Sequence, residues 1–104
     1  MSTIIPNSQL GPAMALVQLL QEHPELPRGS WSIDQEVPTL HGHLHGADLS
    51  GLAAYRALLG GDVCESHDYT VRGDRVRSHR LHTTWRDIEL TIAVVVPAPA
   101  LVTA

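Results

Sequence analysis

The sequence contains no lysine, no phenylalanine and only one cysteine, Cys64, in 104 residues. A single cysteine cannot form an internal disulfide, which argues against a small secreted domain held together by several disulfides. The longest apolar run, IAVVVPAPALV, is interrupted by two prolines and is too short to cross a bilayer. The first residues, MSTIIPNSQL, have neither a basic segment nor a long apolar segment, so no signal peptide is expected. These absences predict a cytoplasmic protein that has no membrane partner.

All seven basic residues are arginine, and a high-GC genome accounts for the lack of both lysine and phenylalanine, whose codons are AT-rich. The net charge of −4 is spread unevenly along the chain. Residues 1–71 carry two arginines against eight acidic residues, whereas residues 72–104 carry five arginines against three acidic residues. Such an asymmetry can mark a surface for nucleic acid or an acidic partner, although a negative protein repels polyanions at long range.

The length and the 43% hydrophobic content indicate one globular domain over residues 1–104, with frayed tails at 1–7 and 97–104. Helical spacing predicts a first helix over residues 10–23 and a second that begins at Asp48 or Ser50 and ends at Gly60. The first helix is expected to face the core with a stripe that Leu16 and Leu19 widen and that consists of Leu10, Met14, Val17 and either Leu20 or Gln21. The second helix is expected to do so with Leu52, Tyr55 and Leu59.

Strands are predicted over residues 31–33, 37–45, 63–71, 75–84 and 88–96. The predicted fold is α+β with two layers, in which two helices pack on one face of a mainly antiparallel sheet of about five strands. The element order is α-β-β-α-β-β-β.

Two turns set the register of the last three strands. A two-residue turn at Arg86-Asp87 pairs Trp85 with Ile88. For residues 63–84, a two-residue turn directs Cys64, Ser66, Asp68 and Thr70 to the core face, whereas a three-residue loop at 72–74 directs Val63, Tyr69 and Val71 there. We prefer the second register because it buries apolar groups, although it requires a left-handed conformation at Asp74.

The sequence HGHLHG at residues 41–46 places three of the seven histidines at alternate positions. In a strand, Leu40 and Leu44 point to one side, while His41, His43 and His45 point to the other. Since the leucines must face the core, the histidines are expected to face solvent. The full set expected on this open face is His41, His43, His45, Arg80, His82, Thr84, Glu89 and Thr91.

This face suggests a small accessory module without enzymatic activity that contacts a protein partner or a second copy of itself. An alternative is a zinc or nickel site formed by His41, His43, His45 and His82, because imidazoles two residues apart can converge on one ion. A pH-sensitive interface is another interpretation of the same histidines. Without a metal, no cofactor is expected.

Nucleic-acid binding is a third alternative, carried by the arginines of the hairpin over residues 72–86. Strand alternation splits these side chains between the two faces, and no aromatic residue is interleaved with them. The arginines in question are Arg72, Arg75, Arg77, Arg80 and Arg86.

No catalytic residue is predicted, because Cys64 and His67 are three residues apart on a strand and so lie on opposite faces. The chain resembles small uncharacterised α+β proteins of high-GC actinobacteria and of their phages and mobile elements. The resemblance is carried by LVQLLQEHPELP, SWSI, YRALLGG and the closing strands, and it implies no catalytic residue.

Overall fold

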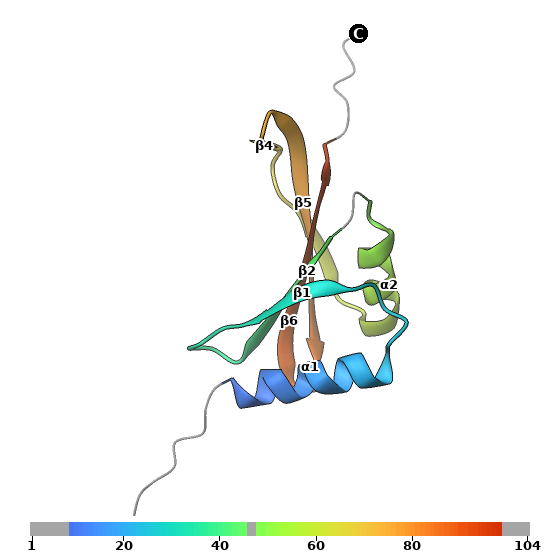
Figure 1. Cartoon of the computed structure of the whole chain (residues 1–104), viewed down its shortest axis with the longest axis vertical. Coiled ribbons are helices and arrows are strands. Elements are labelled where there is room, and N and C mark those ends of the chain that lie inside the picture. Colours follow the sequence, from blue (N-terminus) through green and yellow to red (C-terminus); the bar gives the residue numbers. More distant parts are fainter. Residues whose placement is uncertain (1–8, 46–47, 99–104) are drawn as a thin grey trace, which may run out of the picture.

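The structure is a computed structural model that describes residues 9–45 and 48–98. Two helices and six strands follow one another in the order α-β-β-α-β-β-β-β (Figure 1). The elements are α1 (Leu10–Glu22), β1 (Gly29–Ile33), β2 (Thr39–Leu44), α2 (Ser50–Leu59), β3 (Asp62–Glu65), β4 (Tyr69–Val71), β5 (Asp74–Trp85) and β6 (Ile88–Pro97). The α+β class and the order of the first five elements are as predicted, and the predicted strand over 63–71 is divided into β3 and β4.

One mixed sheet contains all six strands, in the order β1-β2-β6-β5-β3, and β4 pairs with the far end of β5. Every pairing is antiparallel except that of β2 with β6, which is parallel. A parallel pair needs a crossover connection, and here α2 and the β3–β5 segment provide it. As a result β2 and β6, which are distant in sequence, lie side by side at the centre of the sheet.

The hydrophobic core lies between one face of this sheet and the two helices. Leu40 and Leu44 of β2 are 0% and 4% exposed, and they pack with Leu90, Ile92 and Val94 of β6. Helix α1 crosses the end of the sheet where β5 turns into β6 (Figure 1). Helix α2 packs against β5 and β6. The predicted inward direction of the two leucines is therefore confirmed.

Helix α2 is anchored by Tyr55, whose side chain is 1% exposed. Its hydroxyl donates a hydrogen bond of 2.6 Å to the carbonyl oxygen of Pro27, and burial raises the pKa of this phenol. Leu52 is buried beside it, as predicted. Gly60 ends the helix with a φ of 73°, a conformation that glycine adopts without steric cost.

Helix α1 is buried along only part of the predicted stripe. Its buried residues are Pro12, Ala15 and Leu19, and Leu16 packs against the same core, so the predicted inward direction of Leu16 and Leu19 is confirmed. The other predicted inner residues are instead about half exposed, with relative accessibilities of 58% for Leu10, 54% for Met14, 52% for Val17 and 49% for Leu20. The prediction was wrong for these four residues because the helix is apolar on more than one side, so spacing alone did not identify the core face.

The β5–β6 hairpin has the predicted two-residue turn. Arg86 and Asp87 have φ values of 49° and 66°, as a type I′ turn requires, and Trp85 pairs with Ile88. The indole nitrogen of Trp85 donates a hydrogen bond of 2.9 Å to the carbonyl oxygen of Ala15. This bond ties α1 to the end of the sheet.

The β3–β5 segment corrects the preferred register. Arg72 and Gly73 form a two-residue turn with φ values of 51° and 87°, and Asp74 is not in the left-handed region. The pairing of Tyr69 with Val76 turns Tyr69 and Val71 away from the core face, where they are 38% and 45% exposed.

Val63 nevertheless pairs with Leu81 on the core face, as predicted. The register shifts by one residue between the two strands at Ser66. The Ser66 hydroxyl accepts a hydrogen bond of 2.9 Å from the Ser78 amide, a position normally taken by a backbone carbonyl. The structure therefore combines parts of both predicted registers.

At the end of the described chain, Pro97 belongs to β6 and pairs with Val76, so the expected fraying does not begin at residue 97. Ala98 is described as well, and its amide donates a hydrogen bond of 3.0 Å to the carbonyl oxygen of Arg75. Residues 1–7 and 99–104 of the predicted tails lie outside the described residues. Within residues 9–45 and 48–98, no helix has the length and apolar character needed to cross a membrane.

Candidate functional site

The sheet face opposite the helices carries the predicted polar residues. His41, His43 and His45 follow each other at alternate positions on β2 and its end, and all three are exposed. Strand pairing places Thr91 beside His41 and Ala93 beside His43 on β6, and His82 and Arg80 follow on β5. Thr84 and Glu89 pair with each other in the next row of the same face. We call these residues, together with Ser30 and Ser32 of β1, the open face.

An open depression of about 470 Å³ lies at the centre of the open face. Its floor follows β6, where Thr91 and Ala93 are small, and its walls rise from the larger side chains of the flanking strands. The strands that form the walls, β2 and β5, are separated by β6 and therefore lie about 9.6 Å apart. The wall residues on these two strands are His41, His43, Arg80 and His82, and the depression is also lined by Gly42 of β2 and by Ser30, Trp31 and Ser32 of β1.

Ser30 and Ser32 were not predicted as part of this face, although the sequence contained a signal for them. In the strand GSWSI, Trp31 and Ile33 face the core, so alternation directs both serines to the other side. Pairing of Ser30 with His43 and of Ser32 with His41 completes the β1 wall.

His45 is held at the edge of the face rather than in the depression. Its Nε2 atom lies 2.6 Å from the Ser30 hydroxyl oxygen, and its ring meets the His43 ring edge-on at a centroid distance of 5.2 Å. These contacts set the orientation of the His45 ring relative to the His43 ring.

The metal hypothesis places His41 and His82 on neighbouring strands, but β6 lies between their strands. Thr91 is located between the two histidines, and its hydroxyl oxygen is 3.4 Å from Nδ1 of His82. Within residues 9–45 and 48–98, no three histidine, cysteine or acidic side chains are grouped so that they can hold a metal ion. The arrangement is therefore a row of separate imidazoles and not an assembled zinc or nickel site.

Gly42, between two of the histidines, has a packing role that sequence reasoning missed. A Cβ atom at this position would lie 2.6 Å from Cζ3 of Trp31. The Trp31 ring covers the core side of Gly42 and meets the Tyr55 ring edge-on at 6.1 Å. Trp31 thus packs against the core, and it also lines the depression of the open face.

Three of the five C-terminal arginines have carboxylate partners. Arg75 and Arg77 both bind Asp68, and Arg77 also binds Glu65 at 3.2 Å. The hydrogen bonds from Arg77 and then Arg75 hold the pKa of Asp68 below its usual value.

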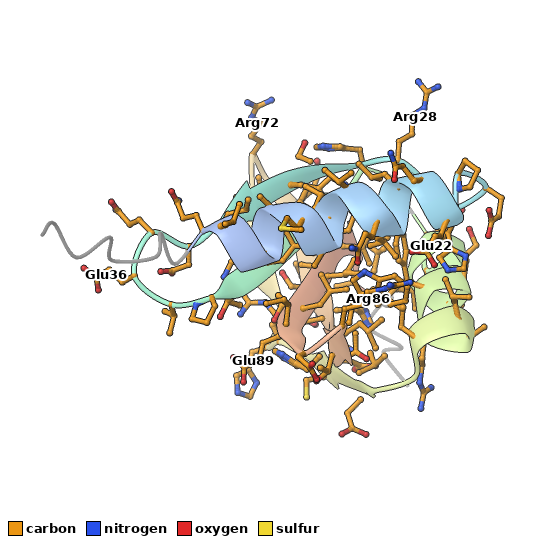
Figure 2. The ribbon with its side chains drawn as sticks, turned by 90° about the horizontal axis from the view of Figure 1, so that it is seen from below. Glu22, Arg28, Glu36, Arg72, Arg86 and Glu89 are labelled. Atoms are coloured by element: carbon orange, nitrogen blue, oxygen red, sulfur yellow. The ribbon has the colours of Figure 1, made fainter. Side chains whose placement is uncertain are left out.

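Arg86 is bound by Glu22 through both carboxylate oxygens at 2.6 Å, and its guanidinium lies 4.9 Å from the centre of the Trp85 ring. Figure 2 shows Arg86 beside Glu22 at α1, whereas Arg72 projects outward from the far turn. Arg72 and Arg86 flank the 12 residues of β5, a length of about 40 Å. The five arginines are therefore separated along the sheet and partly neutralised, which weighs against a continuous nucleic-acid surface.

Arg80 differs from these three arginines because it belongs to the depression and because its side chain forms no ion pair or hydrogen bond with any other residue in the described ranges 9–45 and 48–98. It shares a row with His43, from which it is separated by Ala93. Its neighbour on the other side is Cys64, an exposed thiol of β3. The guanidinium thus offers five hydrogen-bond donors to the open face.

His79 does not belong to the open face and is not paired with His67. His79 is opposite Glu65, and its Nδ1 atom lies 3.6 Å from a Glu65 carboxylate oxygen. His79 is 7% exposed, on the face that α2 covers. It is therefore separated by the sheet from the open-face histidines.

No protein-family model, no curated protein and no solved structure matches this chain. The functional argument therefore depends on the geometry of the open face.

Proposed function

We propose that the protein is a small interaction module without enzymatic activity, and that the open face is its contact surface. The observation that carries this proposal is the concave surface, lined by polar side chains, on the side of the sheet that neither helix covers. Antiparallel sheets commonly keep one face in solvent, so exposure by itself indicates no function. The composition and shape of this face are what distinguish it.

The open face combines hydrogen-bonding groups with a concave surface. Its depression is lined by three histidines, one arginine, two serines and a threonine, together with Trp31, Gly42 and Ala93, and no acidic residue lines it. Binding sites are typically concave and contain a few convergent polar groups. A partner protein or a second copy that inserts a side chain here would find donors on both walls.

The face also differs from the surface around Arg77 and Arg86. The carboxylates of Asp68 and Glu22 occupy the guanidinium groups of these two arginines, which leaves those groups fewer donors for a partner. Arg80 keeps all of its donors. Arginine is one of the residue types that often contribute most to binding near the centre of an interface.

Photo-crosslinking from single positions tests this proposal in the cells that naturally produce the protein. A photoreactive residue at His43 lies in the wall of the depression, and the same residue at Arg56, exposed on α2, is the matched control. We expect a discrete crosslinked product from position 43 and none from position 56. A product with twice the mass of the chain identifies a second copy, and any other discrete mass identifies a partner. Equal crosslinking from both positions, or none from position 43, contradicts the proposal.

A further inference from the structure

We infer that the depression of the open face binds a phosphate monoester through Arg80 and the surrounding histidine and hydroxyl donors. This inference rests on the proposed function and names the chemical group that the surface recognises. It depends on three observations: the supply of donors, the shape of the floor, and the placement of the acidic residues.

The residues that line the depression are rich in donors for an oxyanion. Arg80 presents a planar guanidinium that can contact two phosphate oxygens at once. Imidazole N–H groups and the hydroxyls of Ser30, Ser32 and Thr91 add donors from three further strands. A phosphate group has several acceptor oxygens, so it can use donors from both walls, whereas a carboxylate has two oxygens and uses fewer.

The depression is concave because one small residue of β6 is paired with a large residue on each neighbouring strand. Ala93 pairs with His43 on one side and Arg80 on the other. The walls stand about 9.6 Å apart at the backbone. Charge-assisted hydrogen bonds to a phosphate have lengths of about 2.7–2.9 Å. A phosphate above Ala93 therefore lies within reach of the His43 and Arg80 side chains as they extend from the two walls.

Acidic residues surround the depression but do not line it. Asp62 pairs with His82 at the β3 edge, and Glu89 occupies the row beyond Thr91. On the β1 side, Asp34 is close enough to His41 for an electrostatic interaction. These carboxylates disfavour an extended polyanion that would cross the whole face, and they leave room for one compact phosphate at the centre.

The test is a titration of the ¹⁵N-labelled protein with inorganic phosphate at pH 7 and constant ionic strength, with chloride as the reference anion. Saturable shifts are expected at the Thr91 and Ala93 amides and at Nε of Arg80. Arg80→Gln is expected to weaken binding about tenfold or more, because it removes a charged hydrogen-bonding group. Arg56→Gln removes the same charge from α2 and is expected to leave the affinity unchanged within about twofold.

A second variant tests the shape without changing the charge. Ala93→Val adds two methyl groups to the floor, and valine suits a strand, so the fold is expected to persist. We expect it to weaken phosphate binding while the Arg80 resonance remains observable. Unchanged affinity in Ala93→Val, equal effects of the two arginine variants, or shifts that never saturate overturn the inference.

Phosphoserine and a nucleoside 5′-monophosphate, used as competitors, distinguish the possible sources of the group. Tighter binding of either one than of inorganic phosphate supports the inference and identifies the source. Crosslinking from position 43 without saturable phosphate binding overturns the phosphate inference and leaves the contact surface intact. Failure of both experiments overturns the contact surface as well.

Discussion

Substitution of Gly42 by alanine tests how the open face is supported from beneath. The added Cβ would lie 2.6 Å from Cζ3 of Trp31 and 3.0 Å from Cε3 and Cη2, whereas ordinary contact begins at 3.4 Å. The ring must therefore move by roughly 0.8 Å, the difference between 3.4 and 2.6 Å. Trp31 is packed against Tyr55, so this displacement disturbs the anchor of α2.

Two opposing effects determine the size of the change. Forcing an extra methyl group into a packed region costs about 1–3 kcal/mol. Replacing glycine by alanine in a strand restricts the unfolded chain, which by itself raises the free energy of unfolding by about 0.5–1 kcal/mol. The net expectation for Gly42→Ala is a loss of about 1–2 kcal/mol in the free energy of unfolding. For a domain of this size, that corresponds to a decrease in Tm of about 5–15 °C.

Urea unfolding followed by far-UV circular dichroism measures this loss. Gly51→Ala is the matched control, because its new Cβ meets only the ends of the Leu44 and Pro27 side chains, at 3.3–3.5 Å. It is expected to leave stability unchanged or to raise it by up to about 1 kcal/mol, because alanine suits a helix better than glycine does.

A variant with Trp31→Ala in addition to Gly42→Ala removes the obstructing ring. In the Trp31→Ala background, Gly42→Ala is expected to cause no further loss, because the two positions are coupled only through that ring. Full stability of Gly42→Ala in the natural background would refute the placement of Trp31 over Gly42.

The remaining predictions concern the core, the anchor of α1 and acid stability. Leu19→Ala is expected to cost about 2–5 kcal/mol and Val17→Ala less than about 1 kcal/mol, because only Leu19 is buried; equal losses in urea unfolding would contradict the assigned core face of α1. Trp85→Phe is expected to cost about 1 kcal/mol or more through loss of the hydrogen bond to the Ala15 carbonyl, and unchanged thermal unfolding would contradict that bond. The pKa of Asp68 is lowered in the folded protein, mainly by its hydrogen bond with Arg77. The ionised Asp68 carboxylate therefore stabilises the fold above pH about 4, which is the pKa of an aspartate in the unfolded chain. This stabilisation is lost as the pH falls through the lower pKa that Asp68 has in the folded protein. Asp68→Asn is therefore expected to reduce stability at neutral pH and to approach the natural protein in strongly acidic solution, and a difference that does not depend on pH would contradict this ion pair.

The open face could be predicted from the sequence because strand alternation is a local property. Because side chains alternate along a strand, the inward direction of Leu40 and Leu44 on β2 directs His41 and His43 to the opposite side of the sheet. The Arg86-Asp87 turn then set the register of β5 and β6, since a two-residue hairpin determines which residues are opposite each other.

The features that were mispredicted depend on packing between distant segments. Helix α1 has apolar residues on several sides, and contacts with the sheet select Ala15 and Leu19 over Met14 and Val17. The register shift before β4 depends on the Ser66 hydroxyl, which replaces a backbone acceptor, and no periodicity in the sequence indicates that substitution.

The strand order was equally inaccessible to local patterns. The parallel pairing of β2 with β6 inserts β6 between His41 and His82. The metal hypothesis treated the histidines as neighbours, which they would be only if β2 paired directly with β5.

The most direct test of the account is the reactivity of individual histidines toward diethyl pyrocarbonate, measured by peptide mass spectrometry on the folded protein. His79, 7% exposed beneath α2, is the internal reference for a covered imidazole. The account predicts that His41, His43 and His82 are acylated several-fold faster than His79, and that this difference disappears in urea. Equal rates for His79 and the three open-face histidines in the folded protein would contradict a sheet that is covered on one side and open on the other.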